Sequence, residues 1–201
     1  MITIVDYDAG NLHSVENALK RLGIASRISS DPEEVAGAVK LILPGVGAFG
    51  DAMDQLKRRG LDRALKHAAA AGTPLLGICL GLQVLFEESE ESPGAQGLGI
   101  LKGRIVHIPP EDGLKIPHIG WNSLHLQNDG RLFRNIPENT YVYFVHSYYL
   151  KADDERIVKA TTEYGACIHA SVEEGNVFAT QFHPEKSSRV GMQILQNFCD
   201  L

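Results

Sequence analysis

The sequence predicts an α/β fold: a mostly parallel central sheet with helices on both faces and an antiparallel strand extension. Two observations support this. Up to about residue 86, short apolar runs alternate with segments of helical apolar periodicity. That alternation is typical of parallel strands joined by right-handed crossovers. From residue 101 to residue 181 the chain instead has short strand patterns separated by turns, which is typical of antiparallel pairing.

The elements of the first half begin and end at local signals. Asn11 is a suitable N-cap for a helix with one apolar face, and Gly23 is a suitable end for it. Asp31 followed by Pro32 marks the start of a second helix. The strands expected in this half are residues 2–6, 25–28, 40–43 and 74–78, with helical sequence between the last two.

The second half opens with residues 87–94, an acidic and turn-rich segment that indicates a solvated loop. The strands expected after it are residues 103–108, 120–126, 140–145, 157–162, 167–172 and 177–181. A last helix is expected over residues 187–198. The sequence contains no repeat, low-complexity segment or strong linker, so residues 1–201 are expected to form one domain.

Composition excludes several classes of function. The chain has 19 Lys and Arg against 25 Asp and Glu, a net charge of −6, so nucleic acid is not an expected partner. The longest apolar stretch, residues 74–86, is interrupted by glycines and is shorter than the ~20 residues of a membrane span. The N-terminus has no signal-peptide pattern. We therefore expect a cytoplasmic protein that works without a membrane.

The three cysteines are Cys79, Cys167 and Cys199. They are too few and too scattered for a disulfide framework, and they form no C-x-x-C pair for zinc or redox chemistry. We therefore expect a reducing compartment and neither a metal nor a cofactor. A thiol in such a compartment is free to act as a nucleophile.

Cys79 lies where an apolar strand runs into a helix, with Gly77 and Gly81 two residues to either side. This arrangement is the sulfur counterpart of the nucleophile elbow, whose glycines allow a sharp turn and leave room for a substrate. The free N–H groups and positive dipole of the helix N-terminus favour a thiolate there. A lone cysteine is more often a small buried hydrophobe. The two glycines favour the nucleophile.

A thiol nucleophile needs a base, and His183 follows directly after an apolar run. Pro184 restricts His183 to an extended backbone, from which Glu185 reaches the imidazole. A carboxylate there would orient the ring and stabilise the imidazolium. Most histidines have no catalytic role, and this His-x-Glu pattern gains weight only from the cysteine elbow.

Residues 45–50 fit G-x-G-x-x-G after a strand, a pattern known from dinucleotide sites. Such a site needs an acid about 20 residues further on, at the end of the next strand, but that strand ends at Ile78 and Cys79. We therefore reject NAD binding. We expect an oxyanion hole near Gly47 and Leu80, to which the glycine segment donates a backbone N–H.

Together these segments resemble the class I, triad-type glutamine amidotransferases, which have a flavodoxin-like fold, over the whole chain. Residues 6–12, 44–49, 116–122, 143–149 and 181–187 are similar, more narrowly, to the glutaminase subunits of imidazole glycerol phosphate synthases. The resemblance implies that Cys79 attacks the side-chain amide of L-glutamine. A thioester forms, and L-glutamate and ammonia are released.

The same resemblance implies a partner. Ammonia would pass to a (β/α)8 cyclase subunit in a heterodimer, which makes imidazole glycerol phosphate and an aminoimidazole carboxamide ribotide in histidine biosynthesis. By resemblance, the residues near the face that meets the cyclase are His118, Trp121, Tyr143 and Lys186. For Trp121, the single tryptophan, packing in the core is the simpler expectation.

The resemblance also implies that Gln83, Ser147 and Tyr148 contact the substrate. For Gln83, one helical turn past Cys79, an ordinary helix position is an equally good interpretation. Three further alternatives stay open. The chain could serve another synthase, such as that for pyridoxal phosphate, anthranilate, guanylate or carbamoyl phosphate, although residues 116–122 and 143–149 argue against this. The other two are a stand-alone cysteine hydrolase and a non-catalytic module on the same fold.

Overall fold

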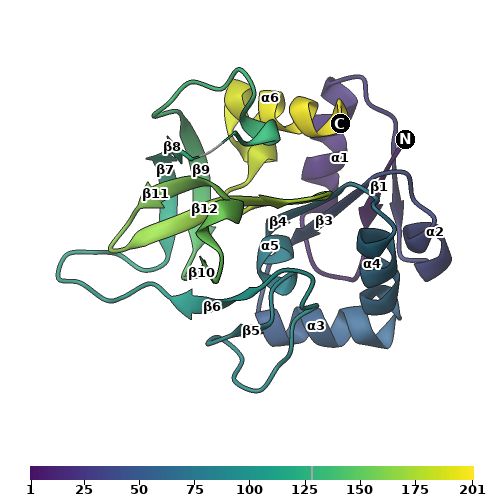
Figure 1. The fold of residues 1–201 in the computed structure, drawn as a ribbon, viewed down its shortest axis with the longest axis horizontal. Helices are drawn as coiled ribbons and strands as arrows, with labels where there is room; N and C mark the ends of the chain where they lie inside the picture. Colours follow the sequence, from purple (N-terminus) through teal and green to yellow (C-terminus); the bar gives the residue numbers. More distant parts are fainter. Residues whose placement is uncertain (128) are drawn as a thin grey trace.

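An eight-stranded sheet forms the centre of the computed structural model, which describes residues 1–127 and 129–201 (Figure 1). Its strands lie in the order β2-β1-β3-β4-β13-β12-β11-β8. The first five pair in parallel, and the last three extend the sheet by antiparallel pairing. The strands are β1 (Ile2–Val5), β2 (Ser26–Ser29), β3 (Leu41–Gly45), β4 (Leu75–Cys79), β8 (His125–Leu126), β11 (Val158–Glu163), β12 (Cys167–Glu174) and β13 (Val177–Thr180). The predicted fold class is confirmed.

Helices cover both faces of this sheet. The helices are α1 (Leu12–Arg21), α2 (Pro32–Ala36), α3 (Phe49–Arg58), α4 (Leu61–Ala70), α5 (Leu80–Val84) and α6 (Ser188–Cys199). Alternation along β3 explains the two layers: Leu41 and Leu43 pack with α2, α3 and α4, whereas Ile42 packs with α1 and α6. In the described part of the chain, no helix has the length and apolar character that crossing a membrane requires.

Polar caps define the starts of two helices, as predicted. Asn11 Oδ1 accepts a hydrogen bond from the Ser14 N–H at 3.2 Å, at the start of α1. Asp31 Oδ1 accepts from the Glu33 N–H at 2.8 Å, and Pro32 occupies the first position of α2. Each such cap contributes about 1 kcal/mol to helix stability. These local signals set where α1 and α2 begin.

Several strands of the second half do not join the central sheet. β5 (Glu88–Ser89), β6 (Gly103–His107) and β10 (Tyr148–Ala152) form a three-stranded sheet, and β7 (His118–Ser123) pairs antiparallel with β9 (Tyr141–His146). The predicted extension is therefore limited to β12, β11 and β8. An alternating pattern fixes which face of a strand is buried but not which strand it pairs with. We call the β7–β9 pair the ribbon.

The acidic segment at residues 87–94 is not the simple solvated loop that its composition predicts. Glu90 Oε2 accepts a hydrogen bond from the His107 N–H at 2.8 Å. Glu91 Oε2 accepts from the Phe49 N–H at 2.8 Å, at the first residue of α3. A carboxylate is stabilised at such a helix N-terminus. The segment is thereby held against α3 and beside the end of β3.

Candidate active site

Cys79 lies at the junction of β4 and α5 in a strained backbone conformation. Its φ of 56° and ψ of −111° lie outside the regions that L-residues usually adopt. Gly77 and Gly81, on either side of Cys79, allow the backbone of the helix to pack closely against the strands. A Cβ on Gly77 would lie 2.6 Å from the Gly81 oxygen, and one on Gly81 would lie 1.8 Å from the Leu43 oxygen. The helix can therefore begin directly at the strand end, as an elbow requires.

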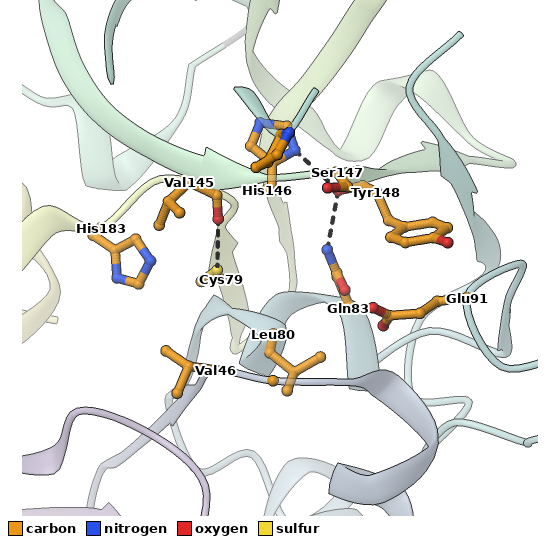
Figure 2. A pocket seen from close by; sticks show the side chains of 12 residues that line it. Val46, Cys79, Leu80, Gln83, Glu91, Val145, His146, Ser147, Tyr148 and His183 are labelled. Atoms are coloured by element: carbon orange, nitrogen blue, oxygen red, sulfur yellow. Dashed lines mark hydrogen bonds between the residues drawn. The ribbon is translucent and has the colours of Figure 1, made fainter. Parts of the chain in front are cut away.

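His183 and Glu185 form a buried pair beside Cys79. His183 has an extended backbone, and its N–H donates to the Tyr143 oxygen at 3.0 Å. Glu185 reaches the His183 ring from the 3-10 turn Pro184–Lys186, not from the extended chain that was predicted. Its Oε1 lies 2.8 Å from His183 Nδ1. A carboxylate only accepts, so Nδ1 carries a proton. His183 Nε2 has no hydrogen-bond partner among the described residues, and Figure 2 shows the ring beside Cys79.

Burial and the neighbouring charges shift the pKa of His183 in opposite directions. The side chains of His183 and Glu185 are 3% and 2% exposed. Burial lowers the pKa of His183, but the interactions of the ring with the adjacent Cys79 and with Glu185 outweigh burial and raise the pKa to about 9. The site therefore favours an imidazolium at neutral pH, and an imidazolium beside a cysteine is one of the surroundings that activate a thiol nucleophile.

The glycine segment after β3 lies next to the elbow. Gly45 pairs with Cys79 in the register of β3 and β4, so the chain leaves the sheet beside the nucleophile. Gly47 has a φ of 103°, which favours glycine, although a Cβ there would meet no atom within 4 Å. Leu80 is the first residue of α5, where backbone N–H groups lack partners within the helix. Both predicted oxyanion residues thus lie beside Cys79.

A cavity of about 290 Å³ brings most of the predicted site residues together (Figure 2). The predicted residues in its wall are Gly47, Cys79, Leu80, Gln83, Ser147, Tyr148 and His183. Glu185 is paired with His183 behind this wall. Within the described residues, no group of three metal-ligating side chains converges. The cavity is of a size and polarity for one small polar molecule.

Gln83 is not an ordinary helix residue. Its side chain is buried, and Nε2 donates to the Tyr148 oxygen and to Gln181 Oε1, both at 3.1 Å. These bonds hold α5 against β10 and fix the Gln83 amide in the cavity wall. Ser147 is held between β9 and β10, where its backbone oxygen accepts from the Ile108 N–H at 2.9 Å.

Some residues of the cavity wall were not predicted from the sequence. They are Val46, Glu91, Pro117, Val145 and His146. Glu91 belongs to an acidic run in which no local feature distinguishes it, and only the packing of that run against α3 brings it here. His146 could have been noticed, because it is a polar residue at a buried position of an otherwise apolar strand.

The residues expected near the partner face divide into exposed and buried ones. Trp121 is 51% exposed, which overturns the expectation that it packs in the core, and its ring lies 6.1 Å from that of Tyr143. Lys186 is exposed. His118 is buried on the other side of the ribbon, where its ring stacks on Phe144. His118 therefore supports the exposed face from beneath.

Comparison with known proteins agrees with this geometry. The profile of the family described as Glutamine amidotransferase class-I matches residues 3–201. Imidazole glycerol phosphate synthase subunit HisH of Moorella thermoacetica is 50% identical over 200 residues, covering 100% of this chain and 94% of the relative. The subunit HisH of Syntrophotalea carbinolica is 49% identical over 206 residues, with 100% of both chains covered. A glutamine amidotransferase of known crystal structure superposes with a TM-score of 0.78 at 21% identity, covering 100% of this chain and 98% of that one. The chain therefore belongs to the class-I glutamine amidotransferase family and, within it, to the HisH subunits of imidazole glycerol phosphate synthase.

Proposed function

We propose that residues 1–201 form one glutaminase domain that hydrolyses L-glutamine to L-glutamate and ammonia. Cys79 is the nucleophile, His183 is the acid and base, and Glu185 orients His183. The observation that carries this proposal is the Nε2 of His183, which has no hydrogen-bond partner among the described residues and lies beside Cys79, with the opposite ring nitrogen held 2.8 Å from Glu185. A thiol, an imidazole and a carboxylate in this order perform acyl transfer.

In the first half of the reaction, the Cys79 thiolate attacks the side-chain amide carbon of glutamine. The carbonyl oxygen takes the negative charge beside the backbone N–H groups of Gly47 and Leu80. The His183 imidazolium then gives its Nε2 proton to the amide nitrogen, the C–N bond breaks, and ammonia leaves. A thioester to Cys79 remains.

In the second half, neutral His183 takes a proton from water as the water oxygen attacks the thioester carbon. The C–S bond breaks, the Cys79 thiolate is restored, and the glutamate side chain leaves as a carboxylic acid that ionises in water. Both protonation states of His183 are used once in each cycle. Glu185 keeps the same ring nitrogen facing Cys79 throughout.

The rest of the cavity is suited to the two charged ends of an amino acid. Glu91 contributes a carboxylate to the wall, which complements an α-ammonium group. Ser147 and Tyr148 contribute polar groups from the opposite wall, and Gln83 is held rigidly between them and the nucleophile. We assign these four residues to substrate binding.

The partner is a cyclase subunit, which we propose to be a (β/α)8 barrel that receives the ammonia. It uses the ammonia to make imidazole glycerol phosphate and an aminoimidazole carboxamide ribotide. Its docking face is the exposed side of the ribbon, where Ile119, Trp121 and Tyr141 are 60%, 51% and 59% exposed. Exposed aromatic and apolar side chains gathered on one face are typical of an interface. The exposed Lys186 lies on the turn that carries Glu185, next to β9.

Replacement of the nucleophile tests the reaction. In the Cys79→Ser variant we expect glutamine hydrolysis to fall by at least about 10³-fold, because a serine hydroxyl there is not ionised. The thermal unfolding midpoint should stay close to that of the parent chain, since the two side chains are similar in size. The complex of this variant with the cyclase should still form product from added ammonium. Glutamine-dependent turnover at the parental rate would disprove the assignment of Cys79.

A further inference from the structure

The side chain of Gln181 lies between the nucleophile and the substrate-binding Gln83. It is completely buried, and its backbone N–H donates to the Ala170 oxygen at 2.8 Å, just past the end of β13. Its Nε2 lies 3.7 Å from Cys79 Sγ, within hydrogen-bonding distance for sulfur. A buried amide must satisfy its polar atoms, and here one of its donors is directed at the reacting atom.

The orientation of this amide follows from its neighbours. The Tyr148 carbonyl oxygen, which can only accept, receives hydrogen bonds from His146 Nδ1 at 2.9 Å and from Gln83 Nε2 at 3.1 Å. Gln83 must therefore turn its NH₂ group, and not its amide oxygen, toward the Tyr148 oxygen. The second N–H of that group meets Gln181 Oε1 at 3.1 Å. With its oxygen so engaged, Gln181 presents its NH₂ group to Cys79.

The surroundings of the sulfur distinguish its two protonation states. The Val145 oxygen lies 3.9 Å from Cys79 Sγ and can accept a hydrogen bond only from the protonated thiol. Gln181 Nε2 donates to the sulfur and interacts more strongly with a thiolate, because a charged acceptor makes the stronger hydrogen bond. Val145 therefore favours the thiol, and Gln181 favours the thiolate.

We propose that Gln181 is a further catalytic residue, whose side-chain N–H stabilises the Cys79 thiolate and holds the sulfur toward the cavity. This inference rests on the proposed function of Cys79. His183 supplies a charge and a proton that change during the cycle and with pH. Gln181 supplies a neutral donor that stays in place in every step.

The pH dependence of Cys79 alkylation tests this role separately from structural packing. We would measure the rate of reaction with iodoacetamide across a pH series, following Cys79 by mass spectrometry. In Gln181→Met, which keeps the length of the side chain and removes the donor, the midpoint of the profile should move up by about one pH unit. The rate on the acidic limb should fall about tenfold, with the plateau at high pH unchanged. A purely structural role would lower the plateau and leave the midpoint in place.

The matched control is Gln193→Met. Gln193 is exposed on α6, and its Nε2 donates to Asn197 Oδ1 at 2.9 Å, so the same substitution there should leave the profile unchanged. Gln181→Glu replaces one NH₂ group by oxygen and keeps the shape of the side chain. It should move the midpoint further than Gln181→Met does. If Gln181→Met does not fold, Gln181→Glu serves as the test variant.

An unshifted midpoint in a folded Gln181 variant would overturn this inference. That result leaves the proposed function intact as long as Cys79→Ser is inactive toward glutamine. If Cys79→Ser keeps its glutaminase activity, the proposed function and this inference both fail.

Discussion

Cys79 differs from the other two cysteines by its surroundings. Burial raises the pKa of Cys199 to about 11. Burial, and then the neighbouring Glu163, raise the pKa of Cys167. Both remain thiols at neutral pH. Cys79 lies beside His183, whose own pKa is raised because Cys79 and Glu185 outweigh the effect of burial. Reactivity is thus decided by which residues the fold brings to each sulfur.

From its proposed role as acid and base, we expect His183 to set how glutamine turnover depends on pH on the alkaline side. Its pKa in the folded chain is about 9, and above that value the imidazolium is lost together with the proton that the leaving ammonia needs. We expect kcat for glutamine to fall about tenfold per pH unit there. Alkylation of Cys79 by iodoacetamide should not fall, because iodide leaves without a proton. Both rates should be measured on the same cyclase complex, and a parallel decline would contradict the acid role of His183.

At the scale of elements, the ribbon has two different faces. One is the exposed face that we propose for docking the cyclase, and the other buries two imidazoles. His118 Nδ1 lies 3.1 Å from His146 Nε2, and His146 Nδ1 lies 2.9 Å from the Tyr148 oxygen. Since that oxygen only accepts, His146 Nδ1 carries its proton and His118 donates to His146 Nε2. Burial lowers the pKa of His118 to about 4 and is the main cause that lowers that of His146 to about 3. Both rings are neutral in the folded chain.

The lowered pKa values of His118 and His146 predict that the folded chain loses stability in mild acid. The unfolded chain binds a proton at each ring near pH 6.5, whereas the folded chain resists protonation down to about pH 4 and about pH 3. The stability from the neutral rings is therefore present above pH 6.5 and is lost as the pH falls below it. The free energy of unfolding should drop by at most about 1.4 kcal/mol per pH unit for each ring.

Urea unfolding across a pH series measures this loss. His118→Phe keeps a ring in the stack on Phe144 and should remove about half of the slope. His67→Phe, at an exposed position of α4, is the matched control and should leave the slope as it is. Equal slopes in the parent chain and in His118→Phe would show that His118 is not the group responsible.

How far the sequence predicts these elements depends on the range of the interactions involved. The caps at Asn11 and Asp31 and the elbow at Cys79 depend on residues a few positions apart, and all three could be predicted. The split of the second-half strands into three sheets could not be, because it depends on which distant strands pair. Glu91 and Gln181 were missed for the same reason. Gln181 acquires its partner only because β13 returns beside β4, next to the helix that carries Gln83.

At the scale of the whole molecule, β9 connects the proposed docking face to the candidate active site. The side chain of Tyr143 lies beside Trp121 on the exposed face. The backbone of Tyr143 instead contacts the segment that carries His183 and Glu185. Its N–H donates to Ser187 Oγ at 2.9 Å, and its carbonyl oxygen accepts from the His183 N–H at 3.0 Å. Two residues further along, the Val145 oxygen lies near Cys79 Sγ. A partner that shifts β9 therefore also shifts groups in contact with the triad.

This connection predicts that the chain alone is a poor glutaminase and that the cyclase activates it. The segment from Gly45 to Gly47 is able to turn an N–H toward or away from the substrate, because Gly47 has a φ of 103° and no atom lies within 4 Å of the position that its Cβ would take. Gaining one oxyanion donor, at about 3 kcal/mol, raises the rate by a factor of order 10². Glutamine hydrolysis should be measured for the chain alone, with cyclase, and with cyclase plus its ribotide ligand. We expect the rate to rise at each addition.

Two variants show whether activation acts through the docking face. Trp121→Ala should require about tenfold more cyclase for half-maximal activation and should leave the low rate of the chain alone unchanged, because Trp121 does not line the cavity. Val39→Ala removes an apolar side chain that is 75% exposed in the loop before β3, and it should change neither value. The partner can activate only by as much as its affinities for the inactive and active states differ. Turnover numbers that agree within a few-fold in all three states would contradict the gating and favour a hydrolase that works independently of a partner.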